Sequence, residues 1–260
     1  MLSVANFNLN KPSLIVAHRG ASNNAPENTL PAFELAWKQG ADAIEVDLHL
    51  TLDGEIVCIH DKTTQAVANK ILIVAQSTLA ELQHLDVGSW FGKRWKGTAI
   101  PTLADVLQIV PEGKRIFLEI KCGQEILPKL FEELKNAQLL PEQVVIISFD
   151  TEVISAFKRN APSDIKAFIL SKFEKDRLSK QVRPVVEDVL QILRLTHADG
   201  YSSKAHKTVT ESFVRRILDE GYEYHVWTID NVRTARKYQK YGAASITTNR
   251  PGYLKEKILP

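Results

Sequence analysis

Two carboxylates stand two residues apart in the segment Ala43–Leu50, where Glu45 and Asp47 alternate with apolar residues. In an extended strand, residues i and i+2 share a face, so both carboxylates are expected to point the same way. Adjacent carboxylates raise each other's pKa unless a cation lies between them. Hard oxygen ligands suit Mg²⁺ or Ca²⁺, without distinguishing the two ions. The pattern predicts a divalent metal site, with a salt bridge to Arg19 or Lys121 as the alternative.

A third carboxylate, Glu119, lies near the end of another strand-like segment, Arg115–Lys121. Lys121 is expected on the same face as Glu119, because the two residues are again two positions apart. Arg19 follows a third apolar segment, and its planar guanidinium group matches two oxygens of a phosphate. The positively charged side chains of Arg19 and Lys121 beside a carboxylate cluster indicate metal-assisted chemistry on a phosphate.

Two histidines also end strand-like segments: His18 follows Leu14–Ala17, and His60 follows Ile56–Ile59. Histidine gains and loses a proton near neutral pH, so a pair can act as base and acid in one reaction. A single histidine is more often a core or loop residue, but these two flank the carboxylate pair in sequence. His49 shares the face of that pair further along the strand and is left without a role.

Two aromatic residues also lie at the ends of strand-like segments: Trp227 ends Tyr222–Trp227, and Phe149 follows Val144–Ser148. They would form an apolar wall for the carbon part of a ligand, or would only pack at the rim. A further aromatic group lies between positions 62 and 100, where it would cover the site or fix that segment: Trp90, Phe91 and Trp95.

Short strand-like runs alternate with longer helical patterns along the chain, which is typical of βα units around a parallel sheet. Eight runs begin at Leu14, Ala43, Arg115, Val144, Ile165, Ala198, Tyr222 and Ser245. Eight parallel strands close a TIM barrel, and active sites lie at the carboxyl ends of its strands. The barrel would therefore bring the candidate residues together on one rim.

Helices are predicted between these strands. The first spans Thr29–Gln39 with Asn28 as its cap. Others lie near 124–138, 151–160, 184–195, 208–220 and 231–240, and one follows Pro101 through Ile109. Leu52-Asp53-Gly54 predicts a hairpin between Ala43–Leu50 and Glu55–His60. Residues 62–100 break the alternation and are interpreted as an insertion in one domain spanning residues 1–260.

The bulk composition excludes several classes of protein. Of the 260 residues, 44% are hydrophobic and 25% are charged, which is ordinary for a globular protein. The net charge of +2 is too small to produce strong overall electrostatic attraction to nucleic acid or to an anionic membrane. No segment reaches the roughly 18 apolar residues of a membrane span, and Met1–Lys11 lacks a signal-peptide pattern. We expect a cytoplasmic protein without stable membrane insertion, in which Cys58 and Cys122 are reduced and mostly buried. The oligomeric state stays open.

Several short motifs in the sequence, taken together, resemble those of the glycerophosphodiester phosphodiesterases. The resemblance covers roughly residues 14 to 254, and it lies in the order of several short motifs: His18-Arg19-Gly20, Glu27-Asn28-Thr29, Glu45-Val46-Asp47, His60-Asp61, Glu119-Ile120-Lys121 and Trp227-Thr228. Each motif alone is a weak signal, whereas the combination is specific. The family fold is a TIM barrel with a small inserted subdomain after the second strand, which fits residues 62–100.

The resemblance implies a role for the matched acidic and imidazole groups. The divalent cation, Mg²⁺ or Ca²⁺, would be bound by three carboxylates: Glu45, Asp47 and Glu119. The general acid and base would be His18 and His60.

The remaining matched residues would contact the substrate. Arg19 and Lys121 would hold the phosphate, and Glu27 would orient Arg19 or contribute to the metal shell. Trp227 would border the glycerol end. Family members often carry asparagine shortly after this tryptophan, where the chain has Asp230-Asn231, so ligand contacts at that loop are left open.

The implied reaction is hydrolysis of a glycerophosphodiester, such as glycerophosphocholine or glycerophosphoethanolamine, to sn-glycerol 3-phosphate and an alcohol. The nucleophile would be water, or the glycerol 2-hydroxyl through a cyclic phosphate. One alternative is a lysophospholipase D or phosphoinositide-type phospholipase acting on membrane lipid, for which Lys93, Arg94 and Lys96 are the only hint. The other is a non-catalytic phosphodiester-binding protein, although no expected histidine or carboxylate is missing.

Overall fold

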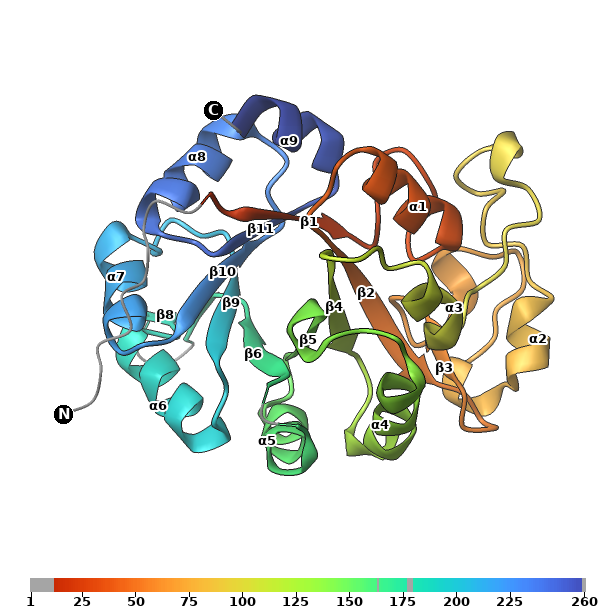
Figure 1. The fold of residues 1–260 in the computed structure, drawn as a ribbon, viewed down its shortest axis with the longest axis horizontal. Coiled ribbons are helices and arrows are strands. Elements are labelled where there is room, and N and C mark those ends of the chain that lie inside the picture. The colour runs from red at the N-terminus through yellow and green to blue at the C-terminus, as the bar shows by residue number, and fades with distance from the viewer. Residues whose placement is uncertain (1–11, 163, 177–179, 259–260) are drawn as a thin grey trace.

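The computed structural model describes residues 12–162, 164–176 and 180–258. Among them, eight parallel strands form a closed ring in which β1 pairs with both β2 and β11 (Figure 1). The ring strands are β1 (Leu14–His18), β2 (Ala43–Leu50), β4 (Arg115–Ile120), β5 (Val144–Ser148), β6 (Lys166–Ser171), β9 (Gly200–Lys204), β10 (Glu223–Trp227) and β11 (Ser245–Thr248). The predicted TIM barrel is confirmed.

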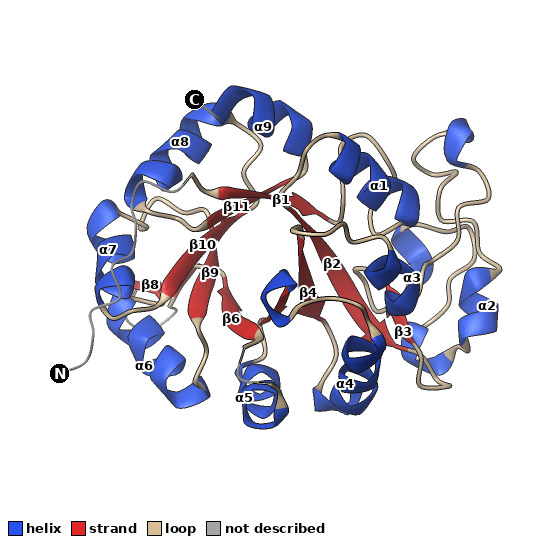
Figure 2. Cartoon of the chain, viewed as in Figure 1, coloured by secondary structure: helices blue, strands red, loops and turns tan. Residues whose placement is uncertain are grey.

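Helices surround the ring on its outer side, as Figure 2 shows. They are α1 (Leu30–Lys38), α3 (Leu103–Gln108), α4 (Leu127–Asn136), α5 (Thr151–Asn160), α6 (Val186–Thr196), α7 (Glu211–Asp219), α8 (Val232–Tyr241) and α9 (Pro251–Ile258). None of the described helices is long and apolar enough to cross a membrane. The segment Met1–Lys11, on which the expectation of no signal peptide rests, lies outside the described residues.

The start of α1 corrects one prediction. Thr29, and not Asn28, is the N-cap, because the Thr29 hydroxyl accepts a hydrogen bond from the backbone N–H of Ala32. Asn28 has a positive φ of 55° and turns its side chain toward the barrel interior, where it contacts Asp47. Both residues are good caps, so the sequence alone favoured the wrong one.

Two features of the fold lie beyond what the sequence pattern indicated. β7 (Glu174–Lys175) and β8 (Val182–Arg183) form a short antiparallel pair between β6 and α6. Helix α9 packs against β1 and α8 and so covers the seam where the ring closes. Two-residue strands contain no measurable periodicity, and α9 is too short to give a clear helical pattern.

The predicted hairpin after β2 is confirmed, since β3 (Ile56–Cys58) pairs antiparallel with the last residues of β2. Residues 62–100 follow it and contain α2 (Leu79–Gln83) and three short 3₁₀ helices, η1 (Thr64–Ala66), η2 (Val74–Gln76) and η3 (Lys93–Trp95). This segment packs around a small apolar cluster of its own: Val57, Ile59, Val74, Leu82, Val87 and Ile100. The cluster is separate from the main core, so the insertion is anchored mainly through β3.

Alternation along the strands divides the protein into two cores. Ile44, Val46 and Leu48 of β2 face outward and pack with the surrounding helices. The opposite faces point into the barrel, where the apolar residues form a smaller cluster: Val16, Ala43, Phe117, Val145, Ile147, Phe168 and Leu170. Glu45 and Asp47 share the inward face, as the two-residue spacing predicted. Cys58 is a buried free thiol and Cys122 a half-buried one, which confirms the expectation for both.

His225 is buried in the barrel interior, although no sequence pattern indicated partners for it. Its ring stacks on Phe168 with centroids 4.1 Å apart, and its Nδ1 lies 2.8 Å from the hydroxyl of Ser245. Glu223 pairs with both His225 and Lys166 on the same inward face. The pKa of Glu223 falls to about 2, because these partners outweigh the effect of burial. This polar network fills the interior below the candidate site.

Glu133 on α4 is expected to weaken the fold at alkaline pH. Burial raises the pKa of its carboxyl to about 7, and its Oε2 has no hydrogen-bond partner among the described residues. A folded-state pKa above the unfolded value means that stability falls as pH rises from about 4.5 to 7. Glu133→Gln should therefore stabilise the protein at pH 8 by about 1 kcal/mol, allowing for solvent screening of this partly exposed side chain.

Urea unfolding of Glu133→Gln at pH 4.5 and pH 8 measures this effect. The gain should be present at pH 8 and small at pH 4.5, where the carboxyl is protonated in the folded state and about half protonated in the unfolded state. The exposed neighbour Glu132 provides the control, since Glu132→Gln should change stability little at either pH. Equal gains at both pH values would show that the carboxylate charge is not the cause.

Candidate active site

The three predicted carboxylates meet at the carboxyl end of the barrel. Glu45 and Asp47 come from β2, and Glu119 comes from β4, where it stands opposite Asp47 in the strand register. One oxygen from each lies within 4.8 Å of the others, and all three residues are buried. The prediction that these residues form one cluster is confirmed, and the cluster could hold a metal ion.

The electrostatics of the cluster fit a divalent cation. Burial and then the charge of Asp47 raise the pKa of Glu45 well above its usual value, and the same two causes raise the pKa of Glu119 to about 7. Glu45 Oε1 and Asp47 Oδ1 are buried without a hydrogen-bond partner among the described residues. Carboxylate oxygens that lack donors and repel one another are suited to bind a hard cation.

The salt-bridge alternative for these carboxylates is also observed. Arg19 Nε lies 3.1 Å from Asp47 Oδ2, and Lys121 Nζ lies 2.7 Å from Glu119 Oε1 and 3.4 Å from Asp47 Oδ1. These cations counteract the burial of Asp47 and hold its pKa below the usual value. They neutralise only part of the acidic charge, because Glu45 receives just the backbone N–H of Arg19. The salt bridges are therefore present, and the acidic charge that they leave could be met by a bound cation.

A tight turn after β1 positions Arg19. Gly20 has φ of 82°, and a Cβ at this position would lie 2.6 Å from the Ala32 backbone, so only glycine fits. The turn directs the backbone N–H of Arg19 to Glu45 Oε2 at 2.9 Å. Glu27 Oε1 accepts a hydrogen bond from Arg19 Nη1 at 2.9 Å. Glu27 thus contacts Arg19 and not the carboxylate cluster, which matches the first of its two predicted roles.

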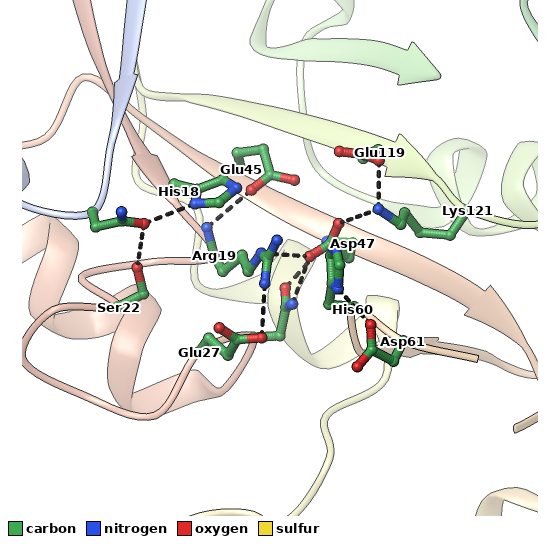
Figure 3. Close-up of polar contacts among 12 residues, drawn as sticks. His18, Arg19, Ser22, Glu27, Glu45, Asp47, His60, Asp61, Glu119 and Lys121 are labelled. Atoms are coloured by element: carbon green, nitrogen blue, oxygen red, sulfur yellow. Dashed lines mark hydrogen bonds and ion pairs between the residues drawn. The ribbon is translucent and has the colours of Figure 1, made fainter. Parts of the chain in front are cut away.

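His18 lies at the end of β1 beside Glu45 in the view of Figure 3. Burial lowers its pKa to about 4, with a further contribution from Arg19, so the ring is neutral at pH 7. Its Nδ1 lies 2.8 Å from Asn249 Oδ1. An amide oxygen only accepts hydrogen bonds, so Nδ1 carries the proton and Nε2 keeps a free lone pair. The ring is therefore oriented to accept a proton through Nε2.

Asn249 and Asp230 contact the site, although the sequence analysis did not name Asn249 and left the contacts of the Asp230-Asn231 loop open. Asn249 Nδ2 donates to Asp230 Oδ2 at 2.8 Å, which fixes the amide with its oxygen toward His18. Asp230 Oδ1 also accepts from the Thr248 hydroxyl and the Asn249 backbone N–H, both at 2.8 Å. Asn249 follows β11 directly, so the rule of polar residues at strand ends could have found it.

The neighbour Asn231 has a structural role. It caps α8, since its side-chain oxygen accepts the Thr234 backbone N–H at 2.9 Å. In the Asp230-Asn231 loop, Asp230 therefore positions His18 through Asn249, whereas Asn231 caps α8.

His60 follows the β3 hairpin strand and approaches the cluster near Asp47 and Lys121 (Figure 3). Its Nδ1 lies 2.7 Å from Asp61 Oδ1, which orients the ring. His49, which had no role in the sequence analysis, is buried on β2 and lies with Nε2 3.2 Å from the His60 carbonyl oxygen. His49 therefore positions the backbone of His60.

Asn28, which the sequence analysis predicted as a helix cap, instead contacts the carboxylate cluster. Its amide Nδ2 donates to Asp47 Oδ2 at 2.8 Å, and its Oδ1 accepts the Asp47 backbone N–H at 3.1 Å. This double contact holds Asp47 in place on β2.

Two of the aromatic residues lie at the carboxyl ends of barrel strands, Trp227 at the end of β10 and Phe149 directly after β5. Trp227 and Phe149 pack edge to face with ring centroids 5.6 Å apart, and Trp227 Nε1 donates to the Ser202 carbonyl at 3.3 Å. Trp90 and Phe91 in the insertion instead pack on each other, and the neighbouring Arg94 donates to the Asn24 carbonyl. Arg94, whose guanidinium group lies 4.8 Å from the centroid of the Trp95 ring, therefore joins the insertion to the loop after β1.

A groove of about 290 Å³ opens beside the cluster. It is lined by residues at the ends of β4 and β5 and in the segments after β3, β4 and β5: Lys62, Glu119, Ile120, Lys121, Cys122, Gly123, Ser148, Phe149 and Asp150. A second ligand group could therefore lie next to a phosphate held at the cluster.

A barrel mouth that combines a carboxylate cluster able to hold a cation, an arginine, a lysine and two histidines is typical of hydrolases of phosphoric esters. Comparison with known proteins narrows this class. The model of the glycerophosphoryl diester phosphodiesterase family matches residues 18–253. The chain belongs to that family.

Relatives span nearly the whole chain. YhdW of Bacillus subtilis is 34% identical over 92% of this chain and 96% of its own length. A glycerophosphodiester phosphodiesterase of Caldanaerobacter subterraneus is 33% identical over 92% of this chain and 95% of its own length. The structure of an Oleispira antarctica phosphodiesterase in complex with its product sn-glycerol-3-phosphate superposes with a TM-score of 0.83 at 26% identity, covering 95% of this chain and 97% of that one.

Proposed function

We propose that the protein hydrolyses glycerophosphodiesters to sn-glycerol 3-phosphate and an alcohol, with a divalent cation, Mg²⁺ or Ca²⁺, bound by Glu45, Asp47 and Glu119. The observation that carries this proposal is the buried carboxylate cluster, in which Glu45 Oε1 and Asp47 Oδ1 accept no hydrogen bond from the described residues, with His18 and His60 beside it. The product complex of the Oleispira antarctica relative supports sn-glycerol 3-phosphate as the common product.

Arg19 and Lys121 bind the phosphate in this proposal. Both side chains are 17% exposed, so they reach the mouth of the barrel while most of each lies in the protein. Their contacts with Asp47 hold the two cations on either side of the same carboxylate. The bound cation supplies further positive charge for the phosphoryl oxygens. Charges fixed before the substrate arrives stabilise developing negative charge without reorganisation.

The two histidines divide the proton transfers. His18 is neutral at pH 7 and presents a free Nε2, so it accepts the proton of the nucleophile. His60, oriented by Asp61, donates a proton to the leaving alkoxide. Trp227, which packs against Phe149, borders the glycerol in this proposal. The expected cytoplasmic location stays a prediction.

The proposed function is tested by incubating the purified protein with glycerophosphoglycerol and measuring glycerol 3-phosphate with a coupled dehydrogenase assay. We expect release in Mg²⁺ or Ca²⁺ and none after EDTA treatment. Restoring either cation should restore release, which separates metal removal from irreversible damage. No release in Mg²⁺, Ca²⁺ or Mn²⁺ would contradict the proposal. Release of choline from lysophosphatidylcholine, with lysophosphatidic acid as the other product, would instead favour the lipid-directed alternative.

A further inference from the structure

Residues 88–98 of the insertion form a loop, here called the aromatic-basic loop, that projects from the edge of the molecule near α1 and is yellow in Figure 1. Its ends are joined by a hydrogen bond from the Val87 backbone N–H to the Thr98 carbonyl. A Cβ on Gly88 would lie 1.9 Å from the Trp95 carbonyl oxygen, so the two sides of the loop are in close contact. The loop carries three aromatic and three basic residues and no acidic one: Trp90, Phe91, Trp95, Lys93, Arg94 and Lys96.

Trp90 presents an apolar surface to solvent. It is 49% exposed, and its ring packs edge to face on Phe91. Its Nε1–H donates to the Val87 carbonyl at 2.9 Å. Because this donor is satisfied within the loop, the ring can enter an apolar layer without leaving a buried N–H unpaired. Tryptophan is also the residue type that is enriched where an apolar layer meets water.

Basic side chains surround Trp90. Lys93 and Lys96 are exposed, and neither has an ion-pair partner among the described residues. Arg94 has a different role, because its guanidinium group lies over the Trp95 ring and donates to a backbone carbonyl outside the loop. The two ammonium groups are therefore available to an anionic ligand, while Arg94 fixes the loop.

Two carboxylates near the loop reduce its positive charge without cancelling it. Asp86 accepts the backbone N–H groups of Gly88 and Ser89 and the Ser89 hydroxyl. Asp105 lines the same pocket as Lys96 and accepts the backbone N–H and the hydroxyl of Thr102. Both are held by hydrogen-bond donors of the protein. Three basic residues thus stand against two acidic ones, and the surface at the loop stays positive.

We propose that the aromatic-basic loop docks the protein reversibly on an anionic lipid surface. Trp90 enters the headgroup region, and Lys93 and Lys96 contact the lipid phosphates. An anionic bilayer complements this surface because it offers negative charge at the headgroups and an apolar layer directly beneath them. Few side chains take part, so the attachment is weak and sensitive to salt.

The loop is joined to the mouth of the barrel. Arg94 donates to the carbonyl of Asn24, in the segment after β1. Ser22 of the same segment donates through its hydroxyl to Asn249 Oδ1 at 3.0 Å, and Asn249 contacts His18. Under the proposed function, the substrates are phospholipids from which both acyl chains have been removed. Docking would therefore hold the enzyme at the surface where deacylation releases its substrate.

Co-sedimentation with lipid vesicles tests the proposal. One set of vesicles contains phosphatidylglycerol and phosphatidylcholine in equal amounts, and the other contains phosphatidylcholine alone. EDTA is present, so that no divalent cation bridges carboxylates to lipid. We expect binding to the anionic vesicles at low salt, loss of most of it at high salt, and little binding to the second set.

Variants assign the binding to the loop. Trp90→Ala should lower the partition coefficient for anionic vesicles on the order of tenfold, because about half of a large ring no longer leaves water. Lys93→Ala and Lys96→Ala should each lower it by about fivefold. The matched controls are Leu195→Ala on α6 and Lys135→Ala on α4, exposed residues away from the loop, and both should bind as the wild type does.

These variants do not touch the active site, so hydrolysis of soluble glycerophosphoglycerol should be unchanged in all of them and reports that they fold. No binding to anionic vesicles at low salt would overturn the proposal, as would equal binding to both sets or undiminished binding of the Trp90 and lysine variants. Self-association that Trp90→Ala abolishes, without vesicle binding, would instead assign the loop to a contact between copies. Vesicle binding without glycerol 3-phosphate release would overturn the proposed function and leave the docking standing.

Discussion

Replacing His18 by alanine is expected to lower kcat for glycerophosphodiester hydrolysis on the order of 10³-fold, within the range for loss of a general base. The physical reason lies in the contacts of the ring. Its Nδ1–H donates to Asn249 Oδ1, and its neutral Nε2 is the one basic atom that β1 contributes to the cluster. KM should change much less than kcat, because Arg19 and Lys121 still bind the phosphate. Steady-state kinetics with a saturating cation measure both constants.

The control for His18→Ala is His84→Ala. His84 caps α2 from an exposed position and contacts only the Ala80 carbonyl, so its loss should leave kcat unchanged. Added imidazole should partly restore the activity of His18→Ala, which a purely structural role would not permit. Full activity of His18→Ala, or a loss that follows a lowered Tm and resists imidazole, would contradict a role in proton transfer.

The same contacts predict a smaller effect of Asn249→Ala. This substitution leaves His18 in place but removes the acceptor that selects its tautomer. A loss of kcat about 10- to 100-fold is expected, in line with partners that orient a catalytic histidine in metal enzymes. Steady-state kinetics beside His18→Ala measure it. An Asn249→Ala enzyme as impaired as His18→Ala would instead indicate that Asn249 contacts the substrate.

Most of the candidate site residues could be predicted from the sequence because they lie at or near the ends of strands. Glu45, Asp47, Glu119 and His18 were all found by asking which polar residues interrupt or end an apolar run. That rule works because the barrel places every such end on one rim, so the direction of the strands fixes the site. Charged residues are easily recognised in such apolar segments, because burying an unpaired charge costs free energy and is therefore rare.

Other residues of the site were missed for identifiable reasons. Asn249 and Asn28 are uncharged amides, and their importance depends on which atoms their neighbours present. Asp230 acts through Asn249, a contact between loops 19 residues apart that no local pattern indicates. His225 was overlooked because alternation shows which face a side chain takes but not its depth in the barrel.

Glu45→Gln is expected to separate the two functions of the carboxylate cluster. Glu45 is buried, its pKa is raised by burial and by Asp47, and its Oε1 lacks a hydrogen-bond donor. Removing its charge should therefore stabilise the protein in EDTA. It should also abolish most of the stabilisation by added Mg²⁺ or Ca²⁺, which for the wild type is about 2.7 kcal/mol when the free cation is 100 times its Kd.

Activity should fall with the loss of cation binding, on the order of 10³-fold at a fixed cation concentration. Thermal unfolding in EDTA and in each cation measures the first effect, and glycerol 3-phosphate release measures the second. Glu27→Gln is the matched carboxylate-to-amide control, because Glu27 contacts Arg19 and not the cluster, so cation-induced stabilisation should persist in it. If Glu45→Gln kept the full cation-induced rise in Tm, the cation would bind elsewhere, and the raised pKa of Glu45 would reflect burial and carboxylate repulsion alone.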